Sequence, residues 1–145
     1  MGLTLPQALY DRLRTHGEET YPNECCGVLL GSADDDTVTV AETVRAGNTR
    51  TDSAHNRYNI APEELVRIQR QARGKGLDIV GFYHSHPDHP AMWSPTDFAE
   101  AHWLGCAYVI TSVDNRKANL TNAWILKGSG EEDKRFEKIE VVKKR

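Results

Sequence analysis

A chain of 145 residues with 39% hydrophobic and 27% charged residues has the size and composition of one globular domain, expected to span residues 1–145. Its formal net charge of −3, without a basic cluster outside the tail Lys143–Arg145, argues against a nucleic-acid-binding protein. No apolar run approaches the roughly 20 residues that cross a bilayer, and residues 1–6 do not resemble a signal peptide. Because its three cysteines, two of them adjacent, do not form a secreted disulfide pattern, the sequence predicts a cytoplasmic protein without a membrane partner.

Hydrophobic periodicity and turn residues predict alternating helices and strands. Pro62, for example, stands in the first turn of a predicted helix and is followed by Glu63 and Glu64, which favour the positive end of the helix dipole. In chain order the predicted elements are a helix at 5–20, a strand at 25–30, a hairpin turn at 32–36, strands at 37–44 and 57–60, a helix at 62–74, a strand at 77–83, a helix at 94–104, and strands at 107–111, 120–126 and 136–142. This order predicts an α/β fold, in which helices pack on a mixed sheet.

Two histidines directly follow the predicted strand 77–83, in the pattern His84-Ser85-His86. Because side chains at i and i+2 of a strand lie on the same face, both imidazoles can point to one place. Neutral imidazole is a common zinc ligand, and Pro87 then turns the chain out into a loop. The pattern makes these histidines candidate metal ligands, but taken alone it is more typical of a polar strand end that meets solvent.

A second pattern, Ser94-Pro95-Thr96-Asp97, is typical of a helix N-terminus. Ser94 is the expected N-cap, and Asp97 its capping-box partner. The Asp97 carboxylate is also a candidate third metal ligand. Two histidines and one carboxylate leave the fourth tetrahedral position for water, which indicates a catalytic zinc rather than a structural one.

A hydrolase also needs a general base to take a proton from the attacking water. Glu24 stands at the entrance to the apolar strand 25–30, where partial burial would raise its pKa toward neutrality. A charged residue that only marks the start of a strand is the alternative. Spacing does not exclude three other carboxylates near the candidate ligands, Asp78, Asp88 and Glu100.

The cysteines and the other histidines are weaker candidates. Cys25 and Cys26 point in opposite directions on a strand, so they and Cys106 are expected to be small buried side chains. His89 in the loop after the histidine pair is a further candidate ligand, which its position in a loop disfavours. Spacing identifies no partner for the remaining histidines, His16, His55 and His102.

These residues together resemble the signature of the JAMM (catalytic MPN) metalloprotease family. The match consists of Glu24, then His84-Ser85-His86, seven residues, Ser94, two residues and Asp97. Residues 22–31, and Arg57-Tyr58 before residues 62–65, are similar to the small bacterial members. The resemblance covers nearly the whole chain. It implies an MPN-type, cytidine-deaminase-like mixed sheet flanked by helices.

The resemblance also implies a role for each matching residue. His84, His86 and Asp97 would bind one Zn²⁺ with a catalytic water, and Glu24 would be the general base. Ser94 would donate a hydrogen bond to the tetrahedral oxyanion. The enzyme would then be a zinc metallopeptidase of the deubiquitinase-like type.

Members of this family cleave peptide or isopeptide bonds after the C-terminal tail of ubiquitin or ubiquitin-like proteins. A chain this short looks like the bacterial members that act on a ubiquitin-like sulfur-carrier protein ending in Gly-Gly. Cysteine is then one candidate for the released group, which would connect the enzyme with cysteine biosynthesis. Two alternatives stay open, a non-catalytic MPN interaction and dimerisation module and a zinc hydrolase of a small amide. The sequence also leaves a homodimer open.

Overall fold

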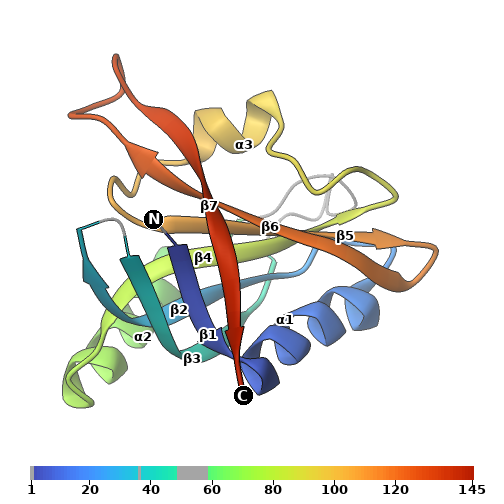
Figure 1. Ribbon diagram of the computed structural model, residues 1–145, viewed down its shortest axis with the longest axis horizontal. Coiled ribbons are helices and arrows are strands. Elements are labelled where there is room, and N and C mark those ends of the chain that lie inside the picture. Colours follow the sequence, from blue (N-terminus) through green and yellow to red (C-terminus); the bar gives the residue numbers. More distant parts are fainter. Residues whose placement is uncertain (1, 36, 49–58) are drawn as a thin grey trace.

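The computed structural model describes residues 2–35, 37–48 and 59–145, and in this part of the chain the strands form one closed, mixed sheet (Figure 1). The order of strands around the sheet is β1-β3-β2-β4-β5-β6-β7, and β7 pairs with β1. The strands are β1 (Gly2–Pro6), β2 (Cys26–Asp34), β3 (Thr37–Ala46), β4 (Asp78–Pro87), β5 (Ala107–Asp114), β6 (Lys117–Lys127) and β7 (Arg135–Lys144). The helices are α1 (Gln7–Thr20), α2 (Pro62–Gly74) and α3 (Pro95–Glu100).

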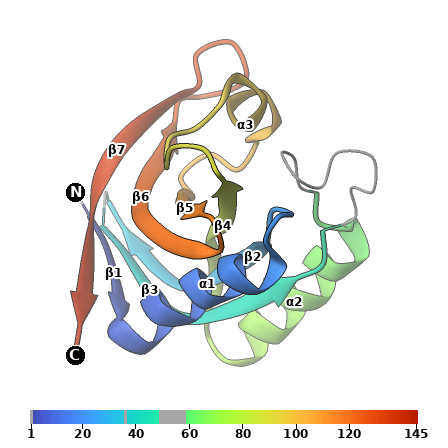
Figure 2. The same ribbon diagram turned by 90° about the vertical axis from the view of Figure 1, so that its right-hand side faces the viewer.

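Both longer helices bury an apolar face against the sheet. Leu9 and Leu13 of α1 belong to one cluster of buried side chains, and Ile68 and Ala72 of α2 belong to another. Figure 2 shows α1 and α2 on opposite sides of β3. The predicted α/β fold, a mixed sheet with helices packed on it, is therefore confirmed. Within the described ranges, no helix has the combined length and apolar character that a bilayer crossing requires.

The first residues differ from the prediction. The helix predicted over residues 5–20 begins only at Gln7, because Gly2–Pro6 form β1. β1 pairs in parallel with both β3 and β7, and its Leu3 and Leu5 are fully buried. Two apolar residues in alternation are too weak a signal for a strand, and the register comes from partners far away in the sequence.

Other boundaries also shift. β4 continues through the histidine pair to Pro87, so both histidines lie within the sheet and not after it. α3 ends at Glu100 instead of at residue 104, because Ala101 takes an extended conformation. Of the strand predicted at 57–60, the first two residues lie outside the described part of the chain, and the last two are not in a strand.

Gly31→Ala should destabilise the protein by about 1–3 kcal/mol, the usual cost of overpacking. Gly31 lies at a register shift between β2 and β3, and a Cβ atom there would collide with the backbone oxygen of Thr39. Gly74→Ala at the end of α2 is the matched control, because a Cβ atom there meets nothing within 4 Å. Urea denaturation of both variants measures the difference. Equal unfolding free energies would contradict this account of the β2–β3 contact.

Candidate metal centre

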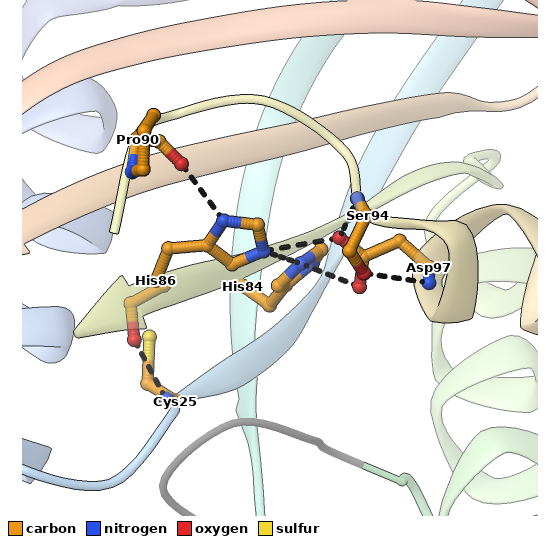
Figure 3. Close-up of polar contacts among 7 residues, drawn as sticks. Cys25, His84, His86, Pro90, Ser94 and Asp97 are labelled. Carbon is orange, nitrogen blue, oxygen red and sulfur yellow. Dashed lines mark hydrogen bonds and ion pairs between the residues drawn. The ribbon is translucent and has the colours of Figure 1, made fainter. Parts of the chain in front are cut away.

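The two histidines of β4 lie side by side in the interior. β4 pairs with β2 on one side and with β5 on the other, and His84 is opposite Cys26 and Ile110 in these pairings. His84 and His86 are both buried, and their Nε2 atoms are 3.2 Å apart. As expected from a period of two, the strand presents both imidazoles on the same face (Figure 3). Strands on both sides of β4 hold the pair in place.

Asp97 brings a carboxylate from α3 to the same point. Its Oδ1 lies 3.3 Å from the Nε2 of His84, and its Oδ2 lies 3.0 Å from the Nε2 of His86. Among the described residues, these three form the one group of His, Cys, Asp or Glu side chains whose candidate ligand atoms all lie within 4.8 Å of one another. The structure thus brings together the three residues that the sequence proposed as ligands.

The N-terminus of α3 orients this carboxylate. Asp97 Oδ2 accepts a hydrogen bond from the backbone N–H of Ser94 (2.9 Å), and Ser94 Oγ accepts one from the backbone N–H of Asp97 (3.0 Å). The predicted capping box is therefore present, with Pro95 in the first turn. It leaves the carboxylate free to face both imidazoles, as Figure 3 shows. The Asp97 carboxylate is thus both part of the capping box and the candidate ligand.

A second contact fixes the ring of His86. Its Nδ1 lies 2.9 Å from the carbonyl oxygen of Pro90, in the loop between β4 and α3. A carbonyl oxygen only accepts hydrogen bonds, so Nδ1 carries the proton and donates it. With the proton on Nδ1, the Nε2 of the neutral ring carries the lone pair, which is the tautomer that a metal ligand at Nε2 needs.

Burial and the contacts among Asp97, His84 and His86 determine the protonation states of these three side chains. Burial alone would raise the pKa of Asp97, but hydrogen bonds with His84 and His86 outweigh it and hold that pKa below its usual range. Burial lowers the pKa of His84. For His86, burial also acts to lower the pKa, but the contact with Asp97 outweighs it and raises the pKa. The carboxylate is thus ionised beside a neutral His84, as divalent metal binding requires.

Glu24 is a buried carboxyl group beside these three residues. It is 4% exposed, and within the described parts of the chain its Oε1 has no hydrogen-bond partner. Burial raises the pKa of Glu24 to about 8, with the negative charge of Asp97 acting in the same direction. The next residue is anchored, because the backbone N–H of Cys25 donates to Ser85 Oγ at 2.9 Å. A buried, unpartnered oxygen at this place is suited to a bound water or metal ion.

A cavity of about 650 Å³ opens the group to the surface. Its wall combines residues from β4, from the following loop and from the start of α3, together with Glu24. The lining residues are Glu24, His86, His89, Pro90, Met92, Trp93, Ser94 and Thr96. Glu24, His86 and Ser94 therefore face one space that a substrate can enter. His89 lines this cavity but is not among the three residues that converge.

The other carboxylates considered from the sequence have different surroundings. Asp88 accepts hydrogen bonds from the Tyr21 hydroxyl and from the backbone N–H of Asn115. Asp78 lies at the opposite end of β4 from the histidines, and Glu100 is an exposed residue at the end of α3. Of the four, Glu24 alone lines the cavity.

The cysteines are buried, as expected. The largest effect on each thiol is burial, which raises the pKa of Cys25 to about 11 and that of Cys106 to about 11. Burial likewise raises the pKa of Cys26. All three are therefore protonated near neutral pH and behave as small apolar side chains.

Sequence reasoning missed the contact between His16 and Tyr83. The Nδ1 of His16 lies 2.8 Å from the Tyr83 hydroxyl, and both side chains are buried between α1 and β4. Burial lowers the pKa of His16 to about 4, with the charge of Arg45 acting in the same direction, so the ring is neutral. His16 follows Leu9 and Leu13 at helical spacing, and this spacing was the available signal that it faces the core. This contact joins α1 to β4 at Tyr83, the residue that precedes His84.

Comparison with known proteins places the chain in a class of hydrolases. Residues 6–127 match the family described as prokaryotic homologues of the JAB domain, and the chain belongs to this family. The chain is 39% identical to desampylase from Haloferax volcanii over 118 residues, which are 79% of this chain and 83% of the relative. It is 30% identical to a probable TtuB-protein conjugate cleaving protease from Thermus thermophilus, over 81% of this chain and 75% of the relative.

A solved structure agrees with the family. The solution structure of protein DSY2949 from Desulfitobacterium hafniense superposes with a TM-score of 0.82 at 26% identity, over 99% of this chain and 93% of that one. The resemblance to the JAMM family and the prediction of a JAMM-type hydrolase are thus confirmed. The roles of the individual site residues stay predictions.

In metal-free protein, Glu24→Gln should become more stable relative to the wild type as the pH rises. Burial raises the pKa of Glu24 from 4.5 to about 8, so between these values the folded protein keeps a proton that the unfolded chain has lost. The stability that this proton contributes is complete below pH 4.5 and is lost as the pH rises through about 8. Gln has no such proton, so the difference should grow by about 3–5 kcal/mol between about pH 5 and about pH 9. Urea denaturation with chelator present measures it, and a difference independent of pH would contradict the burial of Glu24.

Proposed function

We propose that this chain is a cytoplasmic zinc metallopeptidase, with residues 1–145 as one catalytic domain. Its reaction is hydrolysis of the peptide or isopeptide bond after the C-terminal Gly-Gly of a ubiquitin-like sulfur-carrier protein. The observation that carries the proposal is the convergence of His84, His86 and Asp97 beside a carboxyl oxygen of Glu24 that is buried and has no hydrogen-bond partner in the described part of the chain. The names of two relatives, a desampylase and a conjugate-cleaving protease, support the reaction class.

The residues fit a zinc ion by their chemistry. His84 and His86 offer two imidazole nitrogens and Asp97 offers one carboxylate oxygen, which is the ligand set of a catalytic zinc with one open position. When bound, zinc supplies an activated water and polarises the scissile carbonyl. The contact of His86 with the Pro90 carbonyl orients the imidazole, as supporting hydrogen bonds of metal ligands do.

Glu24 is the proposed general base. Glu24 lines the shared cavity, and its buried Oε1, which has no hydrogen-bond partner among the described residues, can take a proton from the attacking water. A pKa of about 8 in the metal-free protein shows how strongly burial favours the proton-bearing form of this carboxyl group. The same oxygen then returns the proton to the leaving amine. A base held close to neutrality serves both steps, because it can accept and release a proton at working pH.

Ser94 is the proposed donor to the oxyanion. Its Oγ already accepts a hydrogen bond from the backbone N–H of Asp97, so its own proton is directed to another acceptor. Ser94 lines the same cavity as Glu24 and His86. A donor already in place when negative charge develops on the substrate oxygen lowers the barrier without further reorganisation.

The Gly-Gly tail is the part of the proposed substrate that chemistry favours. Two glycines carry no side chains, so an extended tail can approach closely to a buried centre that opens through one cavity. Cysteine is one candidate for the group released from the carrier. A non-catalytic module would have no use for a buried Glu24 whose Oε1 lacks a partner among the described residues, next to three converging candidate ligands, because such burial costs stability.

The wild-type protein, purified without a metal-chelating tag, should contain about one zinc per chain and cleave a carrier fusion after Gly-Gly. His84→Ala and Asp97→Ala should lose most of the metal and all measurable cleavage, because each removes one of three ligands. Elemental analysis and mass spectrometry of the products give the two readouts. Full zinc retention in both variants would refute the ligand assignment.

Glu24→Gln is the matched control for chemistry without loss of metal. It should retain zinc and substrate affinity, but cleave at least about 100-fold more slowly, because the amide cannot accept the proton. If the wild-type enzyme cleaves small amides but no carrier fusion, the proposed protein substrate is refuted, while the assignment of the metal site still stands.

Ser94→Ala separates the cap from the oxyanion role. Loss of the cap alone should cost about 1 kcal/mol of stability and leave kcat nearly unchanged. Loss of the oxyanion donor should lower kcat by about 100-fold with little change in KM, which is the result we expect. Zinc content is measured in parallel, since Ser94 also orients Asp97. A zinc-loaded variant with the wild-type rate would leave Ser94 with a purely structural role.

A further inference from the structure

The helix that carries Asp97 is too short to hold its own position. α3 has six residues, and none of them is buried. Isolated helices of this length are unstable in water, because few hydrogen bonds offset the ordering of the first turn. The capping box stabilises the N-terminal end of α3. Something else must hold the C-terminal end, because the position of Asp97 depends on the whole helix.

Lys134 holds that end. Its Nζ donates to the carbonyl oxygens of Phe98 (2.8 Å) and Ala101 (2.9 Å), with a longer contact to Ala99 (3.4 Å). These carbonyls lie at the C-terminal end of the helix, where the dipole favours a cation and where only the Phe98 oxygen also accepts a described backbone N–H, that of Ala101. The Lys134 side chain is 5% exposed, and its ammonium also pairs with Glu131 at 2.8 Å. The ammonium group of Lys134, which has three N–H donors, thus caps the last turn of α3.

An aromatic cluster also packs against α3. The Phe98 ring lies 5.6 Å from that of Phe136 in β7, and Trp93 lies 5.5 Å from Phe98 and 5.4 Å from Phe136. The Nζ of Lys134 is 5.0 Å from the centre of the Phe98 ring. Both ribbon views place α3 beside the first part of β7 (Figures 1 and 2). Polar and apolar contacts with α3 therefore come from the same stretch, residues 134–136.

We propose that Lys134 is a positioning residue for the metal centre, and that it sets the place of Asp97 relative to the two histidines. This inference rests on the proposed function, since it assumes that Asp97 is a ligand. Lys134 lies beyond residues 6–127, which match the family, so the family match does not assign it this role. It acts through α3. A small shift of the helix moves the carboxylate away from imidazoles that β4 holds fixed.

The test compares Lys134→Met with the wild type. Methionine keeps most of the aliphatic length but removes the three donors, so it leaves the helix carbonyls without their cation. We expect Zn²⁺ affinity, measured by chelator competition, to fall by about 10–100-fold, as is usual when a residue that supports a ligand is lost. The visible absorption of bound Co²⁺ should change, because it reports the geometry of the ligands. Circular dichroism and urea denaturation correct both readouts for the folded fraction.

Two further variants make the test specific. Lys134→Arg keeps a cation with several donors and should restore much of the Zn²⁺ affinity. Glu131→Gln removes the ion pair but leaves the carbonyl contacts, and should bind Zn²⁺ as the wild type does. The proposal is overturned if Lys134→Met binds Zn²⁺ with unchanged affinity, even if its unfolding midpoint falls. It is also overturned if Glu131→Gln loses as much affinity as Lys134→Met. A wild-type protein that binds no Zn²⁺ would instead refute the proposed function itself.

Discussion

The candidate site depends on the contact between the Asp97 carboxylate and the imidazoles of His84 and His86. Two different elements must deliver these groups, a strand fixed inside the sheet and a helix that follows a loop. β4 lies between β2 and β5, so the histidines cannot adjust without disturbing both pairings. The position of α3 must therefore match the fixed position of the histidines. The capping box, the aromatic cluster and the Lys134 contacts all act on this helix.

The arrangement costs stability that the rest of the fold must supply. Glu24 and Asp97 are carboxyl groups in a poorly solvated region, and their like charges raise the pKa of Glu24 further. Such groups destabilise a fold when no partner compensates them. The closed sheet and its two hydrophobic clusters provide the opposing contribution. A cation bound only in the folded state would add its binding free energy to stability. Metal binding at a site built from these buried acids would be linked to folding in this way.

The features predictable from the sequence are those with a local signal. Helix 62–74 has a proline and two acids at its start, and its predicted bounds match α2. Strand alternation places His84 and His86 on one face, and the cap pattern places Asp97 at a helix start, because both patterns are local. The contact between the two elements is not local, and the sequence offered it as a candidate that the resemblance to the JAMM family supported. The parallel pairing of β1 with β7 joins the two ends of the chain, and no local pattern encodes it. The same holds for the contacts of Lys134, whose partners lie 33 to 36 residues away.

The role of Ser94 as a helix cap and its proposed role as a donor to the oxyanion depend on the same arrangement of hydrogen bonds. As an N-cap, Ser94 Oγ accepts the backbone N–H of Asp97, and this bond fixes the rotamer of the serine. With one lone pair occupied, the hydroxyl proton has a restricted range of directions, and Ser94 lines the cavity. The return bond from the Ser94 backbone holds the Asp97 carboxylate against the histidines. A single reciprocal pair of bonds at a helix N-terminus thus orients both the proposed hydrogen-bond donor and the candidate ligand. Precision of this kind is difficult to obtain from a loop alone, because a loop lacks the second bond.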